Sequence, residues 1–531
     1  MSTFSASGSH SGQAVVVDNP LQVGERVRAT PPPTAMVIFG GSGDLAHRKI
    51  IPALYNLELN RLLPQNFVVL GVSRTEFSDE GYRADMRKAV EEFSRTQPIQ
   101  PQIWDSFASR LYYATGSSDD PATYARVGDL LERFDHEHGT DGNRLFYLSL
   151  IPKLFPDTIR GIGKAGIGGR GYDRGTSRVV VEKPFGHDLT SARELQALVT
   201  QVFPERDVFR IDHYLGKESV QNIIAFRFAN GIFEPVWNHR YVDHVQVTVA
   251  ESIGIEHRGN FYETAGAIRD IIQNHALQVL ALVAMEPPAT FQPEDVRNEK
   301  AKVLKALRRL SGEAVDRYVV RGQYGRGLIN GQEVVAYREE PDVHPDSNVE
   351  TYVAAQFFVD NWRWAGTPFY LRTGKRLPKR ATEVVVQFKA APHLPFGEAA
   401  RDGLEPNALV LRIQPNEGIT MKFGAKVPGM KMAVRSVNMD FSYGTSFADD
   451  LPDAYERLLL DVMTGDPTLF PRWDSVEQAW EVIQPILDRW AEAPPPELPN
   501  YEAGTWGPKA ADALIARDSD SQGRPRKWRR P

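Results

Sequence analysis

The sequence predicts two domains, a Rossmann-type α/β domain first and then a strand-rich domain with an antiparallel sheet. The chain has 531 residues, which is more than one hydrophobic core usually serves. Short apolar runs alternate with helical patterns up to Glu182, which is typical of a parallel sheet. From Thr351 onward apolar residues recur at every second position, as in Leu409, Leu411 and Ile413. That alternation favours an antiparallel sheet with one covered face.

Composition excludes several classes of protein. A hydrophobic fraction of 42% and a charged fraction of 24% are those of an ordinary soluble globular chain. The net charge of −6 gives no reason to expect a nucleic-acid or membrane partner for the body of the protein. The absence of cysteine excludes disulfides, thiolate nucleophiles and cysteine-bound metal. No secretory signal is visible, and the most apolar helical stretch, residues 276–285, is too short to span a bilayer. A cytoplasmic location is the simplest expectation.

A glycine-rich turn follows the first predicted strand. Residues 1–34 are rich in serine and glycine and then in proline, so we expect a flexible leader that is dispensable for chemistry. Residues 35–39 are apolar, and residues 40–46, GGSGDLA, lead into a helical pattern. Strand, glycine-rich turn and helix are the context that a dinucleotide-phosphate loop requires. Because the spacing G-x-x-G-x-x-A is not the commoner G-x-G-x-x-G, a tight turn without a ligand stays open at this point.

The residue after the second strand bears on cofactor choice. Residues 67–71 form the second predicted strand, and Arg74 follows it. A carboxylate there would bind the ribose hydroxyls of NAD, whereas an arginine suits the 2′-phosphate of NADP. Arg74 therefore favours NADP, although the nearby Glu76 leaves NAD possible.

Further strands are expected at residues 111–115, 145–150 and 178–182, with a helix over 124–138. Lys183 follows the last of these strands, and Pro184 biases it away from the α region. Ligands bind beyond the carboxyl ends of strands in open α/β sheets, so an ammonium there could reach both cofactor and substrate. A solvated lysine is equally compatible with this stretch alone.

Two other segments are expected to carry no chemistry. Asp-His-Glu-His at residues 135–138 lies at a predicted helix end with no further ligand cluster, so we do not expect a metal site. Residues 161–176 are rich in glycine with interspersed basic residues, which favours a flexible loop.

The stretch Arg-Ile-Asp-His-Tyr-Leu-Gly-Lys-Glu, at residues 210–218, concentrates ionisable groups. A helix starting after Asp212 would place His213 and Lys217 on one face, with Asp212 as the N-cap. A helix N-terminus favours anions, and His213 and Lys217 would add two cationic donors beside it, so this arrangement predicts a phosphate site with a carboxylate at its edge. A surface helix can also carry such charges without a role, so the motif alone does not decide.

Hydride chemistry would also need a base. A Rossmann domain supplies a nicotinamide cofactor, and oxidation of an alcohol requires removal of the hydroxyl proton. Histidine suits this role because its reference pKa is ~6.5, and a carboxylate commonly orients it. The candidates are histidines 213, 239, 244, 257 and 275. The residues alone do not choose among them, and in its apolar helix over 260–285 His275 would more often be a satisfied core residue.

The ordered set of motifs resembles the glucose-6-phosphate dehydrogenase family. The three stretches quoted at residues 40–46, 182–186 (EKPFG) and 210–218 occur there in this order and spacing. The resemblance continues through residues 269–275, 372–375, 414–417 and 451–457. It therefore covers about residues 35–510.

The resemblance implies roles for individual residues. His275 corresponds to the base that takes the C1-hydroxyl proton, and Asp212 corresponds to its carboxylate partner. The positions corresponding to the phosphate grip are His213, Tyr214 and Lys217, and those that hold the sugar or its phosphate are Lys183, Glu251, Asp270, Lys375 and Gln414. The positions corresponding to the cofactor site are Gly40, Ser42, Gly43, Asp44, Leu45, Arg74, Tyr147 and, again, Lys183.

The family also implies an activity and an architecture. The expected reaction oxidises D-glucose 6-phosphate at C1 with NADP⁺, or more weakly NAD⁺, to 6-phospho-D-glucono-1,5-lactone, the first step of the oxidative pentose phosphate pathway, with no metal. The expected domains are a Rossmann NADP-binding domain over residues 35–211 and a larger α+β domain over 212–516, whose mostly antiparallel sheet mediates a homodimer or homotetramer. The basic segment at 517–531 is expected to be a flexible, solvated tail.

Three other interpretations stay open. A catalytically silent NADP(H)-binding sensor or scaffold is disfavoured because it has no chemical need for intact Asp212, His275 and Lys217 together. A dehydrogenase of another phosphorylated sugar would be separated by its turnover of glucose 6-phosphate against galactose 6-phosphate. A protein that contacts RNA through the basic tail would bind in a strongly salt-dependent way.

Overall fold

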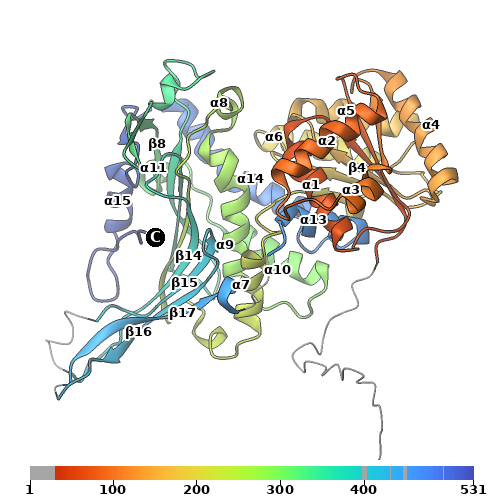
Figure 1. Ribbon diagram of the computed structural model, residues 1–531. Helices are drawn as coiled ribbons and strands as arrows, with labels where there is room; N and C mark the ends of the chain where they lie inside the picture. Colours follow the sequence, from red (N-terminus) through yellow and green to blue (C-terminus); the bar gives the residue numbers. More distant parts are fainter. Residues whose placement is uncertain (1–29, 397–403, 431, 447–450, 494) are drawn as a thin grey trace, which may run out of the picture.

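The computed structural model describes residues 30–396, 404–430, 432–446, 451–493 and 495–531 (Figure 1). Residues 1–29 of the expected leader lie outside the described residues. Its last residue, Thr34, is already the first residue of a strand, because its backbone N–H donates to Asn66 at 3.0 Å.

The first domain is a six-stranded sheet in the order β3-β2-β1-β4-β5-β6, with every neighbouring pair parallel. Its strands are β1 (Thr34–Phe39), β2 (Phe67–Ser73), β3 (Leu111–Thr115), β4 (Arg144–Leu148), β5 (Ser177–Val181) and β6 (Val208–Arg210). Its helices are η2 (Ala46–Ile50), α1 (Ile51–Leu59), α2 (Asp79–Phe93), α3 (Pro101–Ala108), α4 (Pro121–His138), η3 (Pro152–Leu154), α5 (Phe155–Ala165), α6 (Leu189–Val202) and η4 (Glu205–Asp207). The strand order reverses between β1 and β4, which is where open α/β sheets bind ligands.

The second domain is built on an eight-stranded mixed sheet in the order β17-β16-β15-β14-β7-β13-β12-β8. Only the β13–β7 pair is parallel among these neighbours. The strands are β7 (Val242–Ala250), β8 (Val319–Gly322), β12 (Tyr352–Phe358), β13 (Pro368–Gly374), β14 (Ala381–Phe388), β15 (Ala408–Gln414), β16 (Gly418–Lys426) and β17 (Val434–Ser442). The predicted combination of a Rossmann-type domain and a mostly antiparallel α+β domain is confirmed.

The second domain also contains helices of several lengths. They are α7 (Glu218–Phe228), η5 (Glu234–Val236), α8 (Gly259–Ala267), η6 (Ile268–Ala276), α9 (Leu277–Ala284), α10 (Pro293–Ala306), α11 (Glu313–Tyr318), η7 (Tyr337–Glu339), α12 (Tyr443–Ser446), α13 (Ala454–Thr464), α14 (Trp473–Glu492) and α15 (Lys509–Ala516). The remaining short strands are β9 (Tyr324–Gly325), β10 (Gly327–Ile329), β11 (Gln332–Val334) and β18 (Tyr501–Glu502). In Figure 1, α7, α9 and α10 stand between the sheet and the first domain, whereas α15 lies on the opposite face.

Helix α13 belongs to the C-terminal part of the chain but packs on α1 of the first domain. Its Glu456 accepts a hydrogen bond from Arg95 at 2.6 Å and another from Asn56 at 3.1 Å. Its N-cap residue Asp453 is paired with Lys49 at 2.9 Å. The two domains are therefore joined by polar contacts as well as by the chain crossing after β6.

The structure differs from the sequence in the central motif. Residues 213–217 form consecutive turns, and the helix α7 begins only at Glu218 with Lys217 as its N-cap. The turn is closed by Leu215 N–H to Asp212 and by Lys217 N–H to Tyr214, while the Asp212 carboxylate accepts from the Tyr214 N–H at 3.0 Å. Because Asp212 caps this turn instead of a helix, the predicted helical register for residues 213–217 is wrong.

The expected loop at residues 161–176 is partly helical. Helix α5 continues to Ala165, and Ile162 on it is fully buried. At Gly161 an added Cβ would lie 2.1 Å from the ring of Tyr124 on α4, so glycine here lets two helices approach closely. A glycine that signals a loop by composition serves helix packing in this position.

The basic tail is docked on the large sheet, so the expectation of a frayed, solvated segment is wrong. Trp528 is 6% exposed, and its indole N–H donates to Ala511 at 2.8 Å. Arg526 pairs with Asp243 of β7 at 2.8 Å, and Arg529 pairs with Glu383 of β14 at 3.0 Å. Both carboxylates are buried, and the tail supplies the positive charges that they need.

Candidate active site

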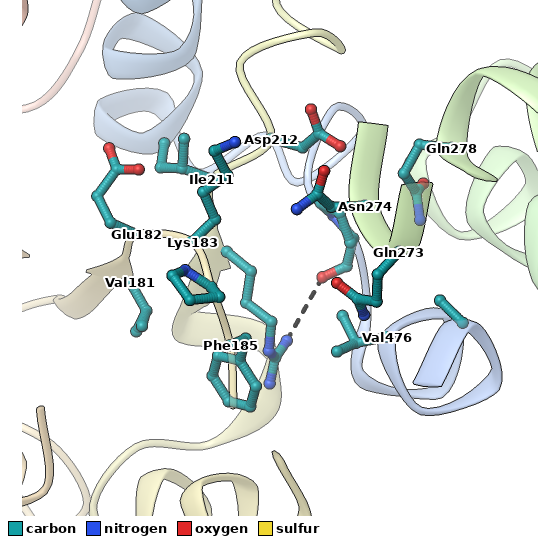
Figure 2. A pocket seen from close by; sticks show the side chains of 14 residues that line it. Val181, Glu182, Lys183, Phe185, Ile211, Asp212, Gln273, Asn274, Gln278 and Val476 are labelled. Atoms are coloured by element: carbon teal, nitrogen blue, oxygen red, sulfur yellow. Dashed lines mark hydrogen bonds between the residues drawn. The ribbon is translucent and has the colours of Figure 1, made fainter. Parts of the chain in front are cut away.

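The residues of interest meet where strands of the first domain end against η6 of the second. Lys183 follows β5, Asp212 follows β6, and Asn274 lies on η6, and all three line one pocket (Figure 2). The ammonium of Lys183 extends toward Asp212 across this pocket. The site thus lies at the carboxyl ends of parallel strands, as expected for an open α/β sheet.

A buried histidine–carboxylate pair lies at the centre. His275 Nδ1 is 2.5 Å from Asp212 Oδ1, and the two residues are 0% and 2% exposed. Within the described residues, His275 Nε2 is buried and makes no hydrogen bond. Because an ionised Asp212 accepts from Nδ1, the neutral ring carries its proton there and leaves a lone pair on Nε2. Among the five histidines that the sequence left open, His275 is the one that pairs with Asp212.

The electrostatics of the pair favour a neutral base. Burial lowers the pKa of His275, and the attraction of Asp212 offsets this only in part. Burial would raise the pKa of Asp212, but its interaction with His275 and the hydrogen bonds that it accepts outweigh this effect, and the pKa is lowered. Asp212 therefore stays ionised at neutral pH while His275 is ready to accept a proton.

Two aromatic neighbours hold the His275 ring. Tyr214 stacks on it with ring centroids 4.4 Å apart, and His213 meets it edge-on at 4.5 Å. Burial, with the nearby positive charges of lysines such as Lys183, lowers the pKa of His213 well below its usual value. His213 is therefore a neutral hydrogen-bonding group, which corrects the prediction of two cationic donors in this motif.

Three lysines around the pair are each held by an acceptor. Lys183 donates to the carboxylate of Asp270 at 3.0 Å, Lys375 pairs with Glu251, and Lys217 donates to Gln414. These six residues come from both domains, and the fold brings them together as the resemblance implied. The charges of Lys183 and Lys375 outweigh the effect of burial and leave the pKa of Asp270 far below its usual value.

The glycine-rich turn has the shape that a dinucleotide phosphate requires. Gly40 has φ +88°, and an added Cβ would lie 1.9 Å from the carbonyl oxygen of Ser149. Gly43 N–H donates to Gly40 at 2.9 Å, and Ser42 Oγ donates to Ser73 at 2.9 Å. Asp44 and Leu45 then open the helical segment. The turn therefore presents backbone without side chains at the end of β1, next to a helix N-terminus.

The other two residues of the expected cofactor site lie differently. Arg74 is exposed just beyond the carboxyl end of β2. Tyr147 on β4 is fully buried, and its hydroxyl donates to Glu182 at 2.5 Å. Tyr147 therefore has no exposed surface of its own with which to contact a cofactor.

Sequence reasoning missed several neighbours of the site. Arg380 donates to Gln414 at 3.2 Å beside Lys217, Tyr455 of α13 stacks over His213 at 6.5 Å, and Glu182 accepts from Tyr147 and Tyr455. Glu182 and Tyr455 belong to stretches that carry the family resemblance, and Arg380 ends a run of basic residues over 372–380, so residue type and location were visible in the sequence. Their contacts were not, because each joins residues far apart in the chain.

The Asp-His-Glu-His segment is engaged in ordinary structural contacts. Asp135 accepts from Arg144 and from Thr140, and His138 is hydrogen-bonded to the Tyr112 hydroxyl at 2.8 Å. No group of three or more metal-binding side chains occurs in the part of the chain that the structure describes. Among those residues, no helix is long and apolar enough to cross a membrane.

Comparisons with known proteins agree along almost the whole chain. Residues 37–222 match the glucose-6-phosphate dehydrogenase NAD-binding domain, and residues 224–529 match the C-terminal domain of the same family. Glucose-6-phosphate 1-dehydrogenase 2 of Mycobacterium tuberculosis is 50% identical over 94% of this chain and 95% of its own length. The enzyme of Chlamydia pneumoniae is 47% identical over 93% of this chain and 96% of its own.

A solved structure of a glucose-6-phosphate dehydrogenase in complex with its substrate glucose-6-phosphate is 36% identical, with a TM-score of 0.83. It covers 92% of this chain, and the match spans 98% of that one. Motifs, fold and site geometry lead to the same conclusion: this chain is a member of the glucose-6-phosphate dehydrogenase family.

Proposed function

We propose that the protein oxidises D-glucose 6-phosphate at C1 with NADP⁺ to 6-phospho-D-glucono-1,5-lactone and NADPH, the entry step of the oxidative pentose phosphate pathway. The observation that carries this proposal is the buried Asp212–His275 pair. His275 Nδ1 lies 2.5 Å from Asp212 Oδ1, and His275 Nε2 has no hydrogen-bond partner among the described residues. The pair lies among cationic side chains at the carboxyl end of a Rossmann sheet. Relatives of 50% and 47% identity that carry the name glucose-6-phosphate 1-dehydrogenase support the choice of substrate.

His275 acts as the general base. Its Nε2 takes the C1-hydroxyl proton, while Asp212 fixes the ring orientation and stabilises the imidazolium that forms. Tyr214 prevents the ring from turning, since it stacks on one face at 4.4 Å. A nicotinamide cofactor, when bound, accepts the hydride that leaves C1.

The phosphate and the sugar are held by the flanking groups. Lys217 supplies a charge for the phosphate, with the neutral His213 and the Tyr214 hydroxyl as further hydrogen-bonding groups. The sugar hydroxyls are bound by Lys183, Glu251, Asp270, Lys375 and Gln414. Because these residues are already paired with one another, their side chains are oriented before the sugar arrives.

NADP is the dinucleotide that the turn and Arg74 fit best. The backbone around Gly40, Ser42 and Gly43 with Asp44 and Leu45 would hold the pyrophosphate, and the exposed Arg74 would hold the 2′-phosphate. Tyr147 lies under this side, and Lys183 reaches from it to the sugar. NAD remains the weaker alternative.

We expect the replacement of Arg74 by alanine to raise the KM for NADP⁺ about tenfold and to leave the KM for NAD⁺ nearly unchanged, because only NADP⁺ loses a charge-assisted contact. Initial rates with each cofactor at saturating sugar phosphate test this. Arg87→Ala, which removes a partly exposed arginine on α2 that pairs with Glu91, serves as the control. Equal losses with both cofactors would show that Arg74 does not read the 2′-phosphate.

We expect the KM for glucose 6-phosphate to rise above pH 8, by up to about tenfold per pH unit. Burial lowers the pKa of Lys217 to about 8, so the free enzyme loses this charge as the pH rises through that value. Bound phosphate favours the charged form, so kcat should change less. Steady-state rates between pH 7 and 9.5 test this, and Lys217→Arg should show a flat KM because guanidinium keeps its charge. Parallel profiles for the two proteins would contradict the assignment.

The reaction itself is tested by following NADPH absorbance with glucose 6-phosphate, galactose 6-phosphate and glucose in parallel. We expect glucose 6-phosphate to have the highest kcat/KM. A preference for another phosphorylated sugar would move the protein to a different substrate. Silence with all three, from a folded protein that still binds NADPH, would favour a dinucleotide sensor.

Assembly and location remain predictions. A homodimer or homotetramer is compatible with β17, a nine-residue strand at one edge of the large sheet that exposes Met439. Light scattering of the purified protein would give the number of copies. The cytoplasm is the compartment in which we expect the enzyme to act.

A further inference from the structure

The buried carboxylate of Glu182 accepts hydrogen bonds from two phenols, one from each domain. The Tyr147 hydroxyl donates to its Oε1 at 2.5 Å, and the Tyr455 hydroxyl donates to the same oxygen at 3.2 Å. Glu182 is 8% exposed, Tyr147 is 0% exposed and Tyr455 is 7% exposed. Both phenols act as donors, because burial and the Glu182 charge raise the pKa of each well above its usual value.

One phenol belongs to the cofactor side. Tyr147 stands on β4 directly beside Ile38 of β1, two residues before the glycine-rich turn begins. It has no exposed surface of its own, so it acts through the position of the strand ends. Glu182 directly follows β5 and precedes Lys183. The hydrogen bond from Tyr147 to Glu182 therefore links the end of β4 to the end of β5.

The other phenol belongs to the substrate side. Tyr455 is part of α13, which is fixed on the first domain by Glu456 and Asp453. Its ring lies parallel to the His213 ring, with centroids 6.5 Å apart and planes 13° apart. His213 in turn meets His275 at 4.5 Å. The orientation of Tyr455 therefore bears on a ring that touches the general base.

Glu182 is not required by the chemistry of the base or by the sugar contacts. A carboxylate removed from water is costly unless it is hydrogen-bonded, and an apolar side chain would fill the space at lower cost. Its two phenols come from elements more than 300 residues apart in sequence, one from each domain. Packing alone therefore does not explain why a carboxylate occupies this position.

We propose that Glu182 is a positioning residue that couples the two halves of the site, holding the cofactor-side strand ends through Tyr147 and the substrate-side ring of His213 through Tyr455. This inference rests on the proposed function, since it assigns a cofactor side and a sugar-phosphate side. It requires that each phenol affects one ligand and that Glu182 affects both.

The test is a pair of double-mutant cycles read by binding. Dissociation constants are measured for NADPH by fluorescence and for glucose 6-phosphate by calorimetry. We expect Tyr455→Phe to raise the dissociation constant of glucose 6-phosphate about tenfold and that of NADPH less than about twofold. Tyr147→Phe should have the reverse effect. Glu182→Gln should weaken both. In the Glu182→Gln background either phenol substitution should add less than about twofold, because its partner is already changed.

A control is Tyr337→Phe, which removes the hydrogen bond from a buried phenol to the partly exposed carboxylate of Glu263, at 2.5 Å, outside the site. It should lower the melting temperature without changing either dissociation constant. If Glu182→Gln does not fold, the opposite selectivity of the two phenol variants still decides. Equal weakening of both ligands by both phenol variants, or multiplied losses in the double variants, would overturn the coupling. A wild-type protein that binds both ligands without forming NADPH would contradict the proposed function. The double-mutant cycles could still be measured in that case, because they depend on binding alone.

Discussion

Replacing His275 by asparagine is expected to lower kcat by about 100-fold or more with only a modest change in KM. Asparagine can still donate a hydrogen bond to Asp212, so the pair keeps its contact, but it offers no basic nitrogen at the place of Nε2. The ground-state complex is therefore retained, and only the step that removes the C1-hydroxyl proton is lost. Initial rates at saturating NADP⁺ and varied glucose 6-phosphate measure both constants.

The chain offers a matched control for this substitution. His244 on β7 is 5% exposed, and its Nδ1 is hydrogen-bonded to Asp243 at 2.7 Å, so it forms a second buried histidine–carboxylate pair away from the site. His244→Asn should leave kcat close to that of the wild type even if it lowers stability. Near-wild-type turnover of His275→Asn, or an equal loss in both variants, would reject His275 as the base.

Replacing Lys217 by alanine is expected to raise the KM for glucose 6-phosphate by about 10- to 100-fold, with a smaller effect on kcat. The ammonium is the charged group that we assign to the phosphate, and Gln414, the hydrogen-bond acceptor that holds it, is neutral. A charge-assisted contact with a phosphate dianion is lost on substitution. Rates at low and high glucose 6-phosphate separate the two constants.

Glucose itself provides an internal comparison, because it has no phosphate. Lys217→Ala should leave the weak oxidation of glucose nearly unchanged. Lys302→Ala, which removes an exposed lysine on α10, should leave the kinetic constants for both substrates unchanged. A Lys217→Ala enzyme with unchanged affinity for glucose 6-phosphate would place the phosphate elsewhere.

The sequence predicted the local elements well, because they depend on short-range patterns. The apolar runs at residues 35–39 and 67–71 became β1 and β2, and the period-two stretches became β14 and β15. The turn after β1 was recognisable because closely spaced glycines between a strand and a helix are typical of a dinucleotide-phosphate loop. The helix predicted at residues 213–217 failed because the Asp212 side chain caps a turn, which the residue type alone does not distinguish from a helix N-cap.

The site needed information that spacing does not hold. Asp212 and His275 are 63 residues apart, and Lys217 and Gln414 are 197 apart, so no local pattern joins them. The choice of His275 among five histidines came from the family resemblance, and its free Nε2 agrees with that choice. The docked tail was missed because its arginines pair with Asp243 and Glu383, whose burial depends on the tertiary fold.

The most direct test of the central claim uses glucose 6-phosphate that carries deuterium at C1. If His275 takes the hydroxyl proton while hydride leaves C1, incubation with NADP⁺ should give NADPH that holds one deuterium per molecule, and the rate should fall relative to the unlabelled sugar. Mass spectrometry of the reduced cofactor reads the label. NADPH without deuterium, or no NADPH from a folded protein that binds both ligands, would contradict the account.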